Sequence, residues 1–337
     1  MSRQSEPRAR YGPRTAVLVG VAVLVVLAGT VGDIWGAFFD GTQNSGNEIV
    51  AVTDFVAPTA DRSVIQKSAG GSAGYIRQGG TYRAYANVTD SGNPESGIGS
   101  VRANLSTITN GQSSAVLSAG SFTVDGQSYN YRSASLSANA LLPAATYNYS
   151  LSMQDAAGNT RTAGGYTVIV DNTNPLGSAI QTANGSGGTV GKPELGDAIT
   201  FTFSEQLDPS SVLSGWGGTS TNVVVRINNN VSAQGGLDAL VVYNSANSSA
   251  LPLGTVRLGR TDYVTANTTF GVTGARSTMV RSGNAIIVTL GGSAGSPSTA
   301  GGNSTMTWFP SAVATDNAGN TVGTASVTES GAADKEF

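Results

Sequence analysis

The feature that most constrains the fold is a two-residue alternation of apolar and polar side chains, which recurs along much of the chain after residue 49. The clearest segments are residues 82–88, 101–105, 147–153 and 199–203. Because successive side chains of a β-strand point to opposite faces, this pattern is typical of strands that bury one face. One-sided burial is typical of antiparallel sheets, so the sequence predicts an all-β chain made of antiparallel sandwiches.

Turn-forming residues divide the alternating segments at the spacing of short strands. Asp125-Gly126 stands between two such segments, and Asp-Gly is a pair that two-residue hairpin turns prefer. The sequence Asp-x-Ala-Gly-Asn occurs twice, at 155–159 and at 316–320. The second copy indicates an internal repeat, and the polar stretch ending at Pro175 predicts a linker between two domains.

The N-terminal residues have the pattern of an export signal. Residues 1–14 carry four arginines and one glutamate, and residues 15–32 carry no charge. A basic segment before an apolar one is the signal-peptide pattern, but this apolar stretch also approaches the roughly 20 residues that span a bilayer. A cleaved signal peptide, a retained anchor and a buried soluble helix remain open. In the first two cases the rest of the chain is extracellular, and it contacts the membrane only through residues 15–32 if they are retained.

These signals give the expected order of segments. The order is a signal peptide or membrane anchor over 1–36, an N-terminal mature segment over 37–48, a first domain over 49–171, a linker over 172–175, a second domain with long loops over 176–329, and a tail over 330–337.

Composition excludes several kinds of chemistry. The 337 residues include no Cys and no His, so a Ser-His-Asp triad, a thiol nucleophile and a zinc site with His or Cys ligands are all impossible. The formal net charge is −3 and there is no basic run in the mature part, so we expect no nucleic-acid partner. The carboxylate pairs nearest in sequence, Asp90 with Glu95 and Glu205 with Asp208, are interpreted as solvated turn residues. We therefore expect no enzymatic activity and no obligatory cofactor.

Calcium is the metal that suits this composition, because it takes oxygen ligands from carboxylates and backbone carbonyls. The candidate ligands are Asp90, Asp155 and Asp171, which would gather where the two domains meet and stiffen the joint. Aspartate is also favoured in turns for its own backbone hydrogen bonds, so a purely structural role stays open. Trp216 and Trp308 are candidates for sugar stacking, although burial in the core is the expected role.

Residues 141–160, "LLPAATYNYSLSMQDAAGNT", resemble the last part of bacterial immunoglobulin-like repeats. The resemblance implies that Tyr147 is the tyrosine of an E–F corner, that its strand is F, and that residues 165–171 form strand G. Residues 196–211, "GDAITFTFSEQLDPSS", resemble a stretch of another group of bacterial immunoglobulin-like surface domains. Together they imply two tandem immunoglobulin-like β-sandwiches after an N-terminal signal or hydrophobic helix.

Residues 29–55, "GTVGDIWGAFFDGTQNSGNEIVAVTDF", resemble the signal-peptide junction of the TasA and camelysin family of secreted biofilm-matrix proteins. The resemblance implies export, cleavage between about Gly36 and Ala37, and assembly into extracellular fibres.

These features predict a secreted, non-catalytic structural protein of the cell surface or biofilm matrix, either fibre-forming or adhesive. The alternative is a carbohydrate- or calcium-dependent adhesion module. The expected partners are further copies of the chain, other surface proteins or polysaccharide.

Overall fold

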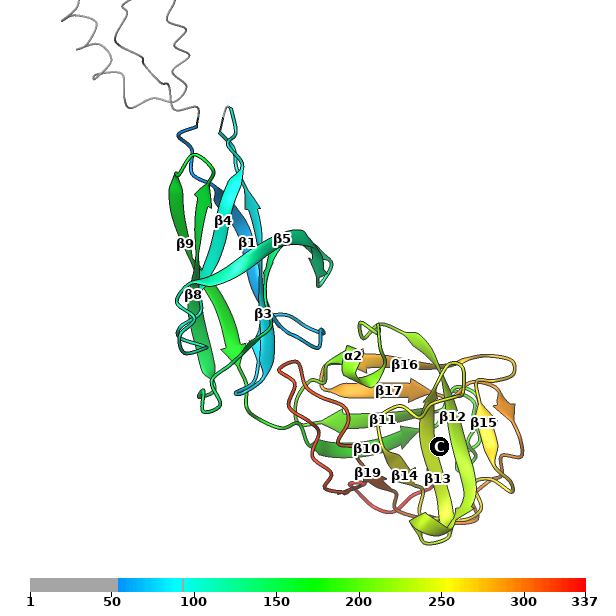
Figure 1. Ribbon diagram of the computed structural model, residues 1–337. Helices are drawn as coiled ribbons and strands as arrows, with labels where there is room; N and C mark the ends of the chain where they lie inside the picture. The colour runs from blue at the N-terminus through cyan, green and yellow to red at the C-terminus, as the bar shows by residue number, and fades with distance from the viewer. Residues whose placement is uncertain (1–53, 93) are drawn as a thin grey trace, which may run out of the picture. The chain divides into compact units, whose positions relative to one another are not determined.

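The computed structural model describes residues 54–92 and 94–337, and this part of the chain is nearly all β (Figure 1). The strands form two sheets, one between residues 59 and 170 and one between residues 177 and 328, and each has its own hydrophobic core. Pairing in the described residues is antiparallel except between the short strand β2 and β9. The expected all-β class of sandwich-like sheets is therefore confirmed.

The predictions for the signal peptide, its cleavage between Gly36 and Ala37, the apolar segment 15–32 and the mature segment 37–48 all lie outside the described residues. Within the described residues, no helix has the length and apolar character needed to cross a membrane.

The first sheet has nine strands in the order β1-β3-β6-β5-β4-β8-β9-β2, with β7 paired to β3. Their bounds are β1 Thr59–Lys67, β2 Tyr75–Ile76, β3 Thr81–Thr89, β4 Ile98–Asn104, β5 Ala115–Val124, β6 Gln127–Ser133, β7 Leu136–Ser137, β8 Ala145–Asp155 and β9 Thr160–Val170.

The two ends of this strand order meet, so the sheet nearly closes around its core. The Gly74 amide donates to the Ile65 carbonyl of β1 (2.7 Å), and the Ile169 amide of β9 donates to the Gly74 carbonyl (2.9 Å). Gly74 thus links the two edges of the sheet through its own amide and carbonyl.

The alternation seen in the sequence matches the burial pattern of β8, whereas in β3 Tyr85 of the expected polar face is also buried, in a small cluster with Val124 and Tyr129. Along β8, Tyr149, Leu151 and Met153 are buried, and the residues between them are exposed or partly buried. The hairpin expected at Asp125-Gly126 is also confirmed, because Val124 pairs with Gln127 across it. Both turn residues have positive φ, 47° and 74°, which a type I′ turn requires.

The second sheet has eleven strands in the order β10-β11-β17-β16-β12-β13-β14-β19-β20, with β15 paired to β12 and β18 paired to β15. Their bounds are β10 Gly177–Ala183, β11 Ala198–Phe203, β12 Thr221–Val231, β13 Leu237–Asn244, β14 Thr255–Arg257, β15 Thr268–Phe270, β16 Ser277–Ser282, β17 Ala285–Thr289, β18 Ser293–Ala294, β19 Thr307–Phe309 and β20 Val327–Thr328. A short helix α2, Pro209–Val212, and a 3-10 turn η1, Ser232–Gln234, connect strands in this region.

Aromatic residues fill the core of the second sheet. Trp308 is fully buried and lies edge-on to Phe201 and Phe203, with ring centroids 5.4 and 5.0 Å away. Its Nε1–H donates to the Leu253 carbonyl (2.6 Å), so the indole has both apolar contact and a hydrogen-bond partner. Trp216 is also buried. The expectation that both tryptophans belong to the core is confirmed.

The last residues pack against the second sheet, although their sequence suggests a tail. Glu336 and Phe337 are buried, and the Phe337 ring lies edge-on to Tyr263 with 6.1 Å between centroids. Asp334 and Ser304 exchange two backbone hydrogen bonds of 2.7 and 3.1 Å. Backbone pairing does not require apolar side chains, so the polar sequence of residues 330–337 did not predict that they pack against the sheet.

Candidate metal centres

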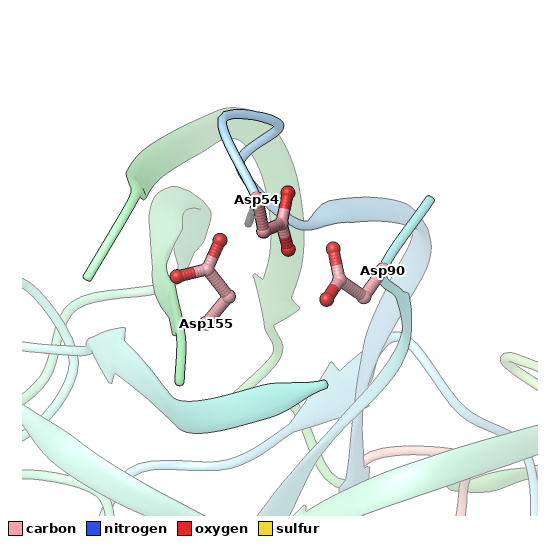
Figure 2. Close-up of side chains that lie close together, drawn as sticks. All are labelled: Asp54, Asp90 and Asp155. Atoms are coloured by element: carbon pink, nitrogen blue, oxygen red, sulfur yellow. The ribbon is translucent and has the colours of Figure 1, made fainter. Parts of the chain in front are cut away.

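Three carboxylates converge at the end of the first sheet where the described chain begins (Figure 2). Asp54 precedes β1, Asp90 directly follows β3, and Asp155 is the last residue of β8. An oxygen from each lies within 4.8 Å of the others. Strand pairing explains why Asp54 and Asp90 lie close together. β1 runs antiparallel to β3 with Thr59 opposite Thr89, so the segment before β1 lies beside the segment after β3.

The first predicted Asp-x-Ala-Gly-Asn turn orients Asp155 in this cluster. One carboxylate oxygen of Asp155 accepts from the Asn159 amide, and the other accepts from Nδ2 of Asn159, both at 2.7 Å. The same Nδ2 donates to the backbone carbonyl of Asp54 (3.0 Å). Asn159 therefore ties the turn to the segment that enters the sheet.

Backbone amides hold the other two carboxylates. Asp54 accepts from the amides of Val56 and Ser96 at 2.9 Å each, and Asp90 accepts from the amide of Gly97 at 2.8 Å. Hydrogen bonds from the Ser96 side chain and then the Val56 amide lower the pKa of Asp54, so it is ionised at neutral pH.

The backbone of the loop after Asp90 passes close to the Asp54 carboxylate. A Cβ atom at Gly92 would lie only 2.3 Å from Oδ1 of Asp54, so a side chain there would displace the carboxylate. The backbone can approach Asp54 this closely only because residue 92 is glycine.

A second cluster with the same plan lies at the start of the second sheet. Its members are Asp171 before β10, Glu205 after β11, and Asp316 in the second Asp-x-Ala-Gly-Asn turn, again with one oxygen from each within 4.8 Å of the others. Gly177 of β10 pairs with Phe203 of β11, which brings the first two together. The bridge between Leu207 and Asp316 brings in the third.

The asparagine of the second turn makes the same hydrogen bonds as that of the first. Asp316 accepts from the Asn320 amide (2.7 Å) and from Nδ2 of Asn320 (2.8 Å). This Nδ2 also donates to the Asp171 carbonyl (2.9 Å). The members of the two clusters therefore correspond one to one. Asp171 corresponds to Asp54, Glu205 to Asp90, and Asp316 to Asp155.

Burial makes the second cluster costly without a counter-charge. Asp316 is 2% exposed, and Oε1 of Glu205 is buried with no hydrogen-bond partner in the described structure. Burial, followed by the negative charges of Asp171 and Asp316, raises the pKa of Glu205 to about 7. Burial also raises the pKa of Asp316. A cation among these oxygens would offset both the desolvation and the repulsion.

The spacing of the oxygens suits calcium. Oxygens that share one Ca²⁺ at about 2.3–2.6 Å can be at most about 5 Å apart, and both clusters meet this limit. Carboxylates and backbone carbonyls are hard oxygen ligands, which calcium prefers, and the chain has no His or Cys to attract zinc.

The structure divides the three residues proposed from the sequence. Asp90 and Asp155 lie together, whereas Asp171 belongs to the second cluster, so the three do not gather at one joint. Sequence reasoning missed Asp54, Glu205 and Asp316. One sign of the correspondence was present, because Asp54 and Asp171 each precede a proline by four residues, in "DFVAP" and "DNTNP".

The interpretation of Asp208 as a solvated turn residue is wrong. Its side chain is 2% exposed, and its Oδ1 caps α2 by accepting from the Ser210 amide (3.0 Å). Glu205 is partly buried, and Glu95 is exposed as expected.

No protein-family model matches this chain, and no curated protein matches its sequence.

Proposed function

We propose that this chain is an extracellular, non-catalytic structural or adhesive protein made of two immunoglobulin-like domains, each binding Ca²⁺ at the end where the chain enters it. The observation that carries the proposal is the repetition of one acidic arrangement, with the same Asn-to-carbonyl hydrogen bond, at equivalent places in both sheets.

The immunoglobulin-like assignment is supported by the start of β8. The Tyr147 hydroxyl donates to the Pro143 carbonyl four residues earlier (3.1 Å), which is the contact that defines a tyrosine corner. β8 then pairs along its length with β9 through the 155–159 turn, as strands F and G do in that fold.

Calcium explains the position of the second cluster. Asp171 follows β9 directly and lies in the segment between the two sheets, while Glu205 and Asp316 belong to the second sheet. An ion held by all three would fix this segment to the second sheet and restrict motion at the joint. A surface or matrix protein under mechanical load gains stiffness from such a joint.

Export rests on the basic and apolar N-terminal pattern, and assembly in a biofilm matrix rests on the resemblance of residues 29–55. Both export and assembly can be tested on the secreted protein. We expect N-terminal sequencing to begin near Ala37 and electron microscopy to show assembled material at the cell surface; an intact N-terminus in the cytoplasm would contradict this part.

The calcium role is tested by thermal and urea unfolding in calcium and in a chelator. A site that binds only the folded state adds about 2.7 kcal/mol of stability when free calcium is 100 times its dissociation constant. We expect calcium to stabilise the wild type, and Asp155→Asn and Asp316→Asn each to reduce the effect. Glu95→Gln is the matched control, because Glu95 is exposed in the loop after Asp90 and outside the cluster. Equal stability in calcium and chelator would overturn the proposal.

A further inference from the structure

A third group of carboxylates lies at the end of the second sheet, and the described residues of the first sheet hold no counterpart to it. Glu329 follows β20, and Asp334 and Glu336 come from the last residues of the chain. One oxygen from each lies within 4.8 Å of the others. Glu329 and Glu336 are buried, with 9% and 0% of their surface exposed, and Asp334 is exposed.

Residues of β10 and of two loops hold the two glutamates in place. Glu336 accepts at Oε2 from the Thr182 hydroxyl of β10 (2.8 Å), and its amide donates to the Tyr263 hydroxyl (2.9 Å). The Glu329 amide donates to the Met306 carbonyl (3.1 Å), and its Oε2 accepts from the Met306 amide (3.3 Å). The carboxylates are therefore positioned by contacts that need no ion.

One carboxylate oxygen of this group, Oε1 of Glu336, is buried and accepts no hydrogen bond from the described residues. Within residues 54–92 and 94–337, no lysine or arginine forms an ion pair with any of the three acids. Two buried carboxylates this close together must hold either a proton or a cation between their oxygens.

We propose that Glu329, Asp334 and Glu336 form a third calcium site, which fastens the final segment of the chain to β10. The exposed Asp334 gives the ion access from solvent, and the two buried glutamates supply the charge that retains it. Three carboxylates and no nitrogen or sulfur ligand select calcium over transition metals. The site shares no residue with the two described above, so it does not rest on their function.

The test is to count bound calcium ions by isothermal titration calorimetry of the exported chain with calcium chloride. We expect Glu336→Gln to bind one calcium fewer per chain than the wild type. Asp334→Asn is the second variant, because its exposed side chain is not needed for packing; it should weaken one site by about tenfold, since affinity follows the number of charged ligands. Glu95→Gln should change neither quantity.

The alternative is that Glu329 and Glu336 only share a proton. Glutamine at 336 would mimic the protonated acid, so in that case Glu336→Gln would keep the wild-type number of calcium ions and Asp334→Asn the wild-type affinities. That pair of results would overturn the third site. If calcium bound only at the Glu336-dependent site, the result would support the third site and contradict calcium binding at the two repeated clusters.

Discussion

Asn159 and Asn320 show how one side chain assembles each repeated cluster. Each amide nitrogen Nδ2 donates to two acceptors, the carboxylate of its own turn and the backbone carbonyl of the aspartate that enters the sheet. Both contacts join protein groups and include no ion. They connect the turn to the entering segment, which would reduce the ordering cost of the proposed calcium binding.

We expect Asn159→Ala and Asn320→Ala to cost similar amounts of stability, about 1–3 kcal/mol each in a chelator, because each leaves one carboxylate oxygen and one backbone carbonyl without their side-chain donor. Calcium affinity at the affected cluster should also fall. The measurement is urea unfolding with and without calcium. Asn148→Ala, at an exposed position of β8, should stay within about 0.5 kcal/mol of the wild type. Unequal losses would argue against equivalent clusters.

At the scale of residues, the sequence revealed the turns but not their partners. The Asp-x-Ala-Gly-Asn repeat predicted both turns, because Gly and Asn favour the backbone they require. It could not predict that Asp54 would meet Asp155, since 100 residues separate them and only strand pairing brings them together. Nor could it predict burial of Glu336, which depends on contacts with Thr182 and Tyr263.

At the scale of elements, the hairpin between β5 and β6 is the clearest case of local sequence fixing local structure. Asp125 and Gly126 both adopt the left-handed region, and Val124 pairs with Gln127 across them. Alternation predicted which residues of β3, β8 and β11 face the core. It did not predict the strand order, because many pairings of half-buried strands satisfy the same alternation.

Gly126→Ala tests the turn directly. An added methyl group at Gly126 would touch nothing within 4 Å, so any loss comes from its φ of 74° and not from a clash. We expect a loss of about 1–2 kcal/mol, the cost of placing an L-residue in the left-handed region. Gly217→Ala is the control, since its added methyl group also meets nothing and its φ is not positive. Chemical denaturation would compare the two; equal effects would contradict the turn assignment.

At the scale of the whole molecule, the absence of histidine makes pH a selective probe. No side chain of this chain has an ordinary pKa between 5 and 8. A change of stability in that range therefore reports carboxyls whose pKa the fold has raised. Glu205, facing Asp171 and Asp316, has a pKa of about 7, and Glu336, facing Glu329 and Asp334, has a pKa of about 8.

We expect stability in a chelator to fall as pH rises from 5 to 8. The pKa of each glutamate is about 4.5 in the unfolded chain and higher in the folded one, so in this window the folded state binds more protons, and linkage makes the free energy of unfolding decrease with pH. Calcium should reverse most of the loss, and its effect should be larger at pH 8 than at pH 5, because the ion must displace those protons. Unfolding free energies from urea titrations at each pH give the slope of stability against pH.

The double variant Glu205→Gln with Glu336→Gln should flatten this slope, since glutamine does not titrate. A slope unchanged in this variant would place the titrating groups elsewhere in the chain, and a calcium effect independent of pH would mean that these carboxyls do not hold the ion.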